Sequence, residues 1–246
     1  MSGVLGTVLT AGTLTWVLMP QARARFGGEV PALAIVGGYG HYMPGPKGET
    51  LHAKGADGAA RARRWLESTT RVNASWVNPQ PEAVPKLTFS WPHGGEDFTF
   101  DLGGTLLRGK FHGQMFFAEA KNYTSLSDLG VLYREYLAKC YCALMERPGY
   151  CDNFMWIAWH PHLVTHWTDL CTAEYVGVAV VEHAQRVLGV PPATATPLVD
   201  SAHCEDVAKR LWLIILSERQ EELVVSPEHR GLIEKFEIEK AAGSHA

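Results

Sequence analysis

The sequence predicts an α/β protein in which a mixed central sheet is flanked by helices. Three observations lead to this prediction. Helical and strand-like patterns follow one another between residues 57 and 188 in the order helix, three strands, helix, strand, helix. Clusters of glycine and proline separate these segments, as turns require. The composition, with 46% hydrophobic and 20% charged residues, is that of a folded globular domain.

The first helix of this core is predicted over residues 57–69, where Asp57 can act as the N-cap and small or apolar side chains share one face. Three strands are predicted next, over residues 86–91, 97–101 and 114–121, because each segment is rich in residues that favour strands. Turn residues stand between them. We therefore expect the three strands to be joined by hairpins.

The second half of the chain predicts a long helix over residues 126–146, a buried strand over 153–159 and a helix over 168–188. A linker and a last helix over 204–223 follow, and the polar tail beyond Phe236 is expected to fray. These segments divide the chain into three parts. They are an N-terminal appendage (1–50), the main domain (51–190) and a helical C-terminal extension (191–246).

The N-terminal appendage contains an uncharged run of apolar and small residues at 4–19, followed by Arg23 and Arg25. A membrane-spanning helix needs about 20 predominantly apolar residues, and several glycines and threonines dilute this run. A buried helix or strand explains it equally well, so both interpretations stay open. If the run inserts, the arginines behind it leave the rest of the chain in the cytoplasm, anchored to the inner face of the cell membrane.

The strand predicted over residues 114–121 carries the candidate chemistry. Side chains alternate between the two faces of a strand, so Glu119 and Lys121 project together from an otherwise apolar segment. Antiparallel pairing brings Asp101, from the preceding strand, beside Glu119. Two carboxylates suit Mg²⁺ or Mn²⁺. Such an ion polarises a phosphodiester and activates water, and a lysine can orient that water.

Asp101, followed by Glu119 and Lys121 with one residue between them, resembles the signature of the PD-(D/E)XK nuclease superfamily. The order of predicted elements resembles that superfamily's αβββαβ core, the restriction-endonuclease-like fold, over roughly residues 55–188. The resemblance implies that Asp101 and Glu119 are metal ligands and that Lys121 is the catalytic lysine. It also implies a further acidic metal ligand on the first helix, for which Glu67 is the match.

The function implied by this resemblance is a Mg²⁺- or Mn²⁺-dependent endodeoxyribonuclease of a restriction, phage-defence or repair system. Its expected partners are DNA, a second copy of the chain and a partner subunit. Arg64 and Arg71, which form a small basic patch with Arg61 and Arg63, are candidates for phosphate contacts, and a solvated helix face explains the patch equally well. Tyr133, on the helix after the motif, is a candidate for DNA contact, although packing against the sheet is the favoured interpretation.

Two features of the composition bear on these expectations. The net charge of −4 and the pI near 6.3 are unlike those of a protein that coats DNA by charge. They favour the alternative function, a non-catalytic scaffold that binds nucleic acid or protein through a nuclease-like fold. Five cysteines without a disulfide framework favour a reducing, cytoplasmic compartment. His160, His162 and His166 follow a strand end, where histidines can ligate a transition metal, but they are interpreted as surface or loop residues because their spacing lacks the helical zinc-binding arrangement.

Overall fold

The computed structural model describes residues 47–122 and 129–243, with side chains from residue 55 onward. The predicted N-terminal appendage, including the candidate anchor at 4–19, lies outside these residues except for its last few positions. Across the described ranges, no helix has both the length and the apolar character that crossing a bilayer requires.

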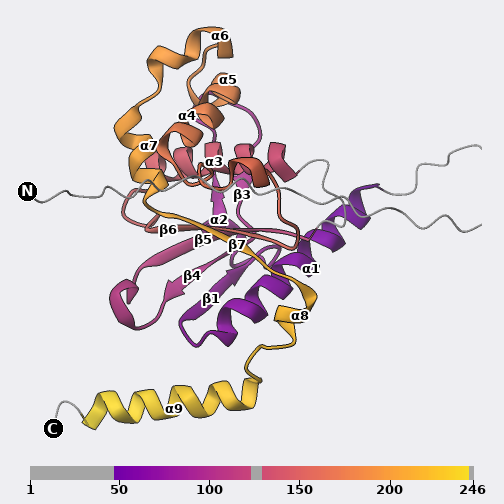
Figure 1. Ribbon diagram of the computed structural model, residues 1–246, viewed down its shortest axis with the longest axis vertical. Helices are drawn as coiled ribbons and strands as arrows, with labels where there is room; N and C mark the ends of the chain where they lie inside the picture. The colour runs from indigo at the N-terminus through magenta and orange to yellow at the C-terminus, as the bar shows by residue number, and fades with distance from the viewer. Residues whose placement is uncertain (1–46, 123–128, 244–246) are drawn as a thin grey trace, which may run out of the picture. The chain divides into compact units, whose positions relative to one another are not determined.

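A mixed five-stranded sheet forms the centre of the protein, in the order β1-β4-β5-β6-β7 (Figure 1). Its strands are β1 (Val72–Val77), β4 (Leu102–Leu106), β5 (Met115–Lys121), β6 (Asn153–Ala158) and β7 (Leu211–Ile215). The pairs β1–β4 and β4–β5 are antiparallel, whereas β5–β6 and β6–β7 are parallel. The predicted α/β class and mixed sheet are thereby confirmed.

Helices cover both faces of this sheet (Figure 1). On one face, α1 (Lys47–Ser68) packs Ala62 and Leu66 into a core that contains Phe116 and Met155. On the other face, α3 (Leu129–Glu146) packs against the larger core, and α4 (Ala173–Glu182) and α7 (Ser201–Ala208) pack on α3. Because alternate residues of β5 enter opposite cores, both cores hold this strand in place.

The strands predicted over residues 86–91 and 97–101 are corrected by the structure. Only β2 (Thr88–Phe89) and β3 (Phe98–Thr99) are extended there, and they pair in a separate two-stranded sheet after the short α2 (Val84–Leu87). Their expected places in the central sheet are taken by β1 and β4, which were not predicted. In β4, a Cβ added to Gly104 would lie 2.0 Å from the Asn73 carbonyl oxygen. This glycine therefore permits close approach of two strands and does not mark a turn.

The C-terminal helix predictions also need correction. Residues 204–223 form part of α7, then β7 and α8 (Glu218–Glu221), because Leu211–Ile215 pairs with β6 and completes the sheet. The helix predicted over 168–188 begins later, where Thr172 caps α4, and it is interrupted at His183 before α5 (Ala184–Val187). The tail expected to fray forms α9 (Pro227–Gly243).

The remaining short helices connect these elements. They are α6 (Pro192–Ala195) and the 3₁₀ turns η1 (Gly109–Phe111), η2 (Val164–His166) and η3 (Thr196–Leu198). The five cysteines, all at described positions, form no disulfide bond.

Candidate active site

The pairing of β4 with β5 brings Asp101 and Glu119 together. Leu102 pairs with Ala118, so continuing the antiparallel register by one residue places Asp101 opposite Glu119. Side chains opposite each other in such a pair lie about 5 Å apart at Cβ on the same face. The Asp101 carboxylate is fixed by the next peptide of β5, because its Oδ2 accepts a hydrogen bond of 2.8 Å from the Ala120 N–H.

Glu119 is buried at the end of the apolar strand, with 4% of its surface exposed. Lys121, on the same face, donates a hydrogen bond of 2.7 Å from Nζ to Glu119 Oε1. The other carboxylate oxygen, Oε2, is buried and meets no hydrogen-bond donor among the residues that the structure describes. A buried anionic oxygen without a partner is costly, which makes this position a candidate for a cation that the protein alone does not supply.

A second lysine, which the sequence interpretation missed, reaches the same carboxylate. Lys139 lies on α3, and its Nζ is 3.5 Å from Glu119 Oε1. Its side chain is as little exposed as that of Lys121, at 16%. The helical period places Lys139 beside the buried positions Tyr136 and Ala143. A lysine at such spacing inside an apolar helix face is a signal of a buried acidic partner.

The surroundings of the two carboxylates shift their pKa values in opposite directions. Burial, together with the charge of Glu119, raises the pKa of Asp101 to about 7. Burial alone would raise the pKa of Glu119 as well, but the Lys121 and Lys139 ammonium groups outweigh it and hold the pKa below its ordinary value. Glu119 is therefore the firmly ionised member, and Asp101 is the one whose charge a nearby cation would stabilise.

The donor set fits a hard divalent cation. Asp101, just before β4, and Glu119 on β5 present neighbouring carboxylate oxygens, and among the described residues Glu119 Oε2 has no hydrogen-bond partner. Within residues 47–122 and 129–243, no group of three or more His, Cys, Asp or Glu side chains gathers in a metal-binding arrangement. Mg²⁺ is commonly held by one or two carboxylates and completes its shell with water and substrate phosphate. Two carboxylates are thus sufficient for such an ion.

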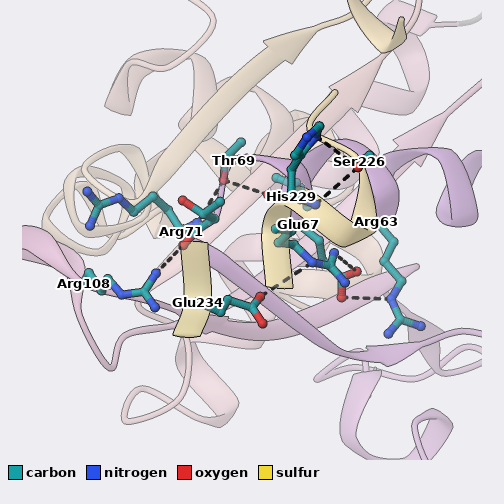
Figure 2. A network of polar contacts seen from close by, with 11 residues as sticks. Arg63, Glu67, Thr69, Arg71, Arg108, Ser226, His229 and Glu234 are labelled. Carbon is teal, nitrogen blue, oxygen red and sulfur yellow. Dashed lines mark hydrogen bonds and ion pairs between the residues drawn. The ribbon is translucent and has the colours of Figure 1, made fainter. Parts of the chain in front are cut away.

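Glu67, the third metal ligand implied by the resemblance, lies elsewhere. The part of α1 next to the end of β5 is at Gly58, where an added Cβ would be 3.3 Å from Asn122 Cβ. Glu67 is about 13 Å further along the helix, at a rise of about 1.5 Å per residue. There its Oε1 accepts from Arg63 and its Oε2 from Arg230 of α9, at 3.1 and 3.0 Å (Figure 2). The structure does not bring it to the two carboxylates.

Two of the candidate nucleic-acid contacts are surface arginines. The side chain of Arg64 is 61% exposed on α1 and lies 3.5 Å from the Glu221 carboxylate. Arg71 is also exposed and lies beside Thr69 (Figure 2). It precedes β1 at Val72, whereas Asp101 lies beyond the pair formed by Val77 and Leu102 at the opposite end of that strand. Of the two arginines, only Arg64 lies toward the end of the sheet that holds the carboxylates.

Tyr133, the third candidate contact, belongs to the core. Its ring is 1% exposed and packs against Trp156 and His162, and its hydroxyl donates to the Leu170 carbonyl at 2.8 Å. In this conformation the ring is not accessible to DNA, as the favoured packing interpretation expects. His162, interpreted from sequence as a loop residue, is likewise buried, and burial lowers its pKa.

Comparison of the chain with protein-family models, with curated proteins and with solved structures found no match in any of the three. The structure itself defines an α/β protein with a mixed five-stranded sheet between helices. At one end of the middle strand, two carboxylates and two ammonium groups form a cluster, which we name the β5 cluster: Asp101, Glu119, Lys121 and Lys139.

Proposed function

We propose that this protein is a metal-dependent nuclease that hydrolyses DNA phosphodiester bonds, with a restriction-endonuclease-like fold. The observation that carries the proposal is the β5 cluster itself. It combines two adjacent carboxylates, one buried oxygen that meets no donor in the described part of the chain, and a lysine on the same strand face. Charges buried at the end of a strand need a stabilising reason, and a divalent ion with a phosphodiester supplies one.

The arrangement of elements supports the same proposal. Setting aside the short α2, the turn η1 and the small β2–β3 sheet, residues 47–122 and 129–158 run α1, β1, β4, β5, α3, β6, which is the αβββαβ order that the resemblance implies. The three antiparallel strands are consecutive neighbours, and α3 crosses over to a parallel β6. The helices α1 and α3 cover opposite faces. An edge strand, β7, extends the sheet beyond this core.

Each residue of the β5 cluster has a role in the proposed reaction. A bound Mg²⁺ or Mn²⁺ would polarise the phosphodiester and lower the pKa of water beside it. Asp101 and Glu119 hold the ion's position, with the Ala120 N–H fixing the Asp101 carboxylate. Lys121 orients the attacking water or offsets the charge that develops on the phosphate. Lys139 keeps Glu119 Oε1 occupied when Lys121 turns to the substrate.

The broader setting follows from the same resemblance and is part of the proposal. Enzymes of this kind serve in DNA restriction, phage defence or repair, and many act as homodimers or with a partner subunit. A net charge of −4 favours such help, because the chain lacks the general basic character of a protein that binds DNA alone. Attachment to the inner face of the cell membrane depends on residues 4–19 and is tested separately, by fractionating the untagged protein.

The deciding experiment is cleavage of plasmid DNA, linear DNA and RNA with Mg²⁺ or Mn²⁺, comparing the wild-type chain with Lys121→Ala. We expect the wild type to cut and Lys121→Ala to lose roughly a hundredfold or more of the rate, as removal of a single group that stabilises transition-state charge does. Lys209→Ala is the matched control, because Lys209 is an exposed lysine remote in sequence from the cluster. Absence of cleavage by wild type would favour the non-catalytic scaffold.

A further inference from the structure

A second polar cluster lies on the α1 side of the same end of β5, and Arg61 is its centre. The Arg61 guanidinium donates from Nε to Glu221 Oε1 at 3.0 Å and from Nη2 to Glu221 Oε2. Its remaining edge donates from Nη1 to Asn122 Oδ1 at 2.9 Å. Its face lies 4.6 Å from the centre of the Trp159 ring. All three nitrogens and one face of this guanidinium are therefore engaged.

The Glu221 carboxylate is bound as an anion. Its side chain is 6% exposed, and Arg64 approaches Oε1 at 3.5 Å in addition to the two contacts from Arg61. The hydrogen bonds from Arg61 lower the pKa of Glu221, while the same pairing raises the pKa of Arg61. A planar fork of donors around two oxygens is also the geometry with which arginine binds phosphate.

The indole N–H of Trp159 lies beside this carboxylate without making a hydrogen bond of full geometry to it. The residue is 8% exposed, and its indole N–H meets no hydrogen-bond acceptor in the described part of the chain. The indole nevertheless lies close enough to Glu221 to contribute, after Arg61, to lowering the pKa of that carboxyl. A carboxylate has two oxygens and both are held by arginine. A phosphate group carries further oxygens, one of which can accept from Trp159.

The position of this cluster relates it to the β5 cluster. Asn122, which contacts Arg61, directly follows Lys121. Trp159 directly follows Ala158, the residue that pairs with Lys121 across β5 and β6. Because successive residues of a strand face opposite sides, the two clusters lie on the two sides of one sheet end. A polyanionic strand that crosses this end meets both.

The segment that supplies Glu221 follows the buried Leu216 and buries little apolar surface of its own. The four-residue helix α8 contains no apolar residue, and Glu221 is its buried member. Leu223, shortly after it, is 82% exposed. Replacing the Glu221 carboxylate by another singly charged anion therefore conserves the charge around Arg61 and gives up little apolar contact.

We propose that Arg61, Arg64 and Trp159 form a binding site for a backbone phosphate of the nucleic acid, and that Glu221 occupies this site when no nucleic acid is bound. The proposal rests on the proposed nuclease function, and it adds the second contact through which an acidic chain holds its substrate. Glu221 then competes with the substrate, so its charge sets the affinity. Arg64 contributes as the exposed member that first meets the incoming phosphate.

The test is the affinity of the full-length chain for labelled single-stranded and duplex oligonucleotides in EDTA, measured by fluorescence anisotropy at several salt concentrations. We expect Glu221→Gln to bind about tenfold more tightly than wild type, because a charge-assisted pair is replaced by a weaker neutral one. Glu222→Gln is the matched control, since it removes one exposed carboxylate from the neighbouring position. Its affinity should stay within about twofold, as expected for a screened surface charge.

If Glu221→Gln lowers the melting temperature, a second variant that leaves the fold intact tests the proposal. Arg64→Gln alters an exposed side chain, so the fold should persist. It should weaken binding and reduce the slope of log affinity against log salt by about 1, as expected for one lost phosphate contact. An affinity of Glu221→Gln no higher than that of Glu222→Gln, or an unchanged salt slope in Arg64→Gln, overturns the phosphate site and leaves Glu221 as a structural brace.

The source of the phosphate is distinguished by following the indole N–H resonance of Trp159, assigned with Trp159→Phe, during titration with inorganic phosphate and with an oligonucleotide. A shift with the oligonucleotide supports the proposal. A shift with inorganic phosphate alone overturns the assignment to nucleic acid. If Glu221→Gln binds oligonucleotides more tightly than Glu222→Gln but neither the wild type nor any variant cleaves DNA, the nuclease proposal fails and the phosphate site stands. If the wild type cleaves DNA and Glu221→Gln binds no more tightly than Glu222→Gln, the phosphate site fails and the nuclease proposal stands.

Discussion

Two acidic side chains, Glu119 and Glu67, were both predicted to be metal ligands, and the structure gives them contrasting surroundings. Glu67 places each of its oxygens on an arginine, Arg63 or Arg230. Glu119 has both lysines at Oε1, and its buried Oε2 meets no donor within the ranges that the structure describes. Within these ranges, both oxygens of Glu67 are thus paired, while one oxygen of Glu119 is not.

The difference shows how a structural carboxylate can be separated from a functional one. A carboxylate that serves the fold meets enough donors to offset the cost of burial. One that serves a ligand stays incompletely paired until the ligand is present. The β5 cluster also holds a second carboxyl, Asp101, whose pKa is raised to about 7 because burial and Glu119 disfavour its charge. A divalent ion between the two carboxylates would both pair with Glu119 and stabilise the charged form of Asp101.

The largest expected effect is on metal binding, and it tests this contrast directly. Glu119→Gln should abolish detectable Mn²⁺ binding in calorimetric titration and reduce cleavage by roughly a thousandfold. Glu67→Gln, the matched change at the fully paired carboxylate, should bind Mn²⁺ as the wild type does. The ion-free forms of both variants should retain the wild-type circular dichroism spectrum. Loss of Mn²⁺ binding in Glu67→Gln would mean that Glu67 reaches the ion after all and that the contrast is wrong.

A smaller effect is expected at Lys139, and it tests whether this lysine holds Glu119 in position. Lys139→Met keeps an unbranched side chain but removes the charge beside Glu119 Oε1. Lys121 must then hold Glu119 and act on the substrate, so we expect kcat to fall about tenfold to a hundredfold, in the range of supporting residues around metal ligands. KM should change little, and Lys139→Arg should restore part of kcat.

The Mn²⁺ affinity of Lys139→Met distinguishes positioning from a merely structural role. Removing a positive charge next to the two carboxylates should leave that affinity unchanged or increase it, because a cation then meets less repulsion. A variant that loses Mn²⁺ affinity, kcat and melting temperature together would show that Lys139 only supports the fold.

Much of the central architecture could be predicted because β5, α3 and β6 have strong periodic patterns. The position of Glu119 and Lys121 on one face of β5 could be predicted because side-chain alternation depends on only a few neighbouring residues. Three strands of the central sheet, β1, β4 and β7, were missed, and the last two were missed for different reasons. In β4, Gly103 and Gly104 resemble a turn in sequence, but Gly104 is required by the close backbone of β1 and Gly103 by the close side chain of Leu87. In β7, the run Leu211–Ile215 continues a helical stretch in sequence, and only pairing with β6 makes it extended.

The candidate site could be predicted only where its members lie close in sequence or share a motif. Lys139 stands on an apolar helix, and its partner is determined by how α3 crosses the sheet. The pairing of Arg61 with Glu221 joins residues from opposite ends of the described chain. Glu67 failed to join the site because helical rise carries it away from the end of β5. Such long-range placements depend on tertiary packing, which no local pattern contains.

The smallest expected effect concerns the stability supplied by the fully paired carboxylate. Glu67→Gln removes two ion pairs whose arginine side chains remain 31% and 42% exposed, so the loss should be about 1 kcal/mol or less. Urea denaturation measures it as a small decrease in the midpoint at unchanged slope. Because salt screens exposed pairs, the difference from wild type should shrink in about 1 M NaCl. A loss of several kcal/mol that persists in salt would instead indicate that Glu67 couples α9 to α1 as a buried, cooperative contact. The two ion pairs of Glu67 would then stabilise the fold more than the exposure of their arginines implies.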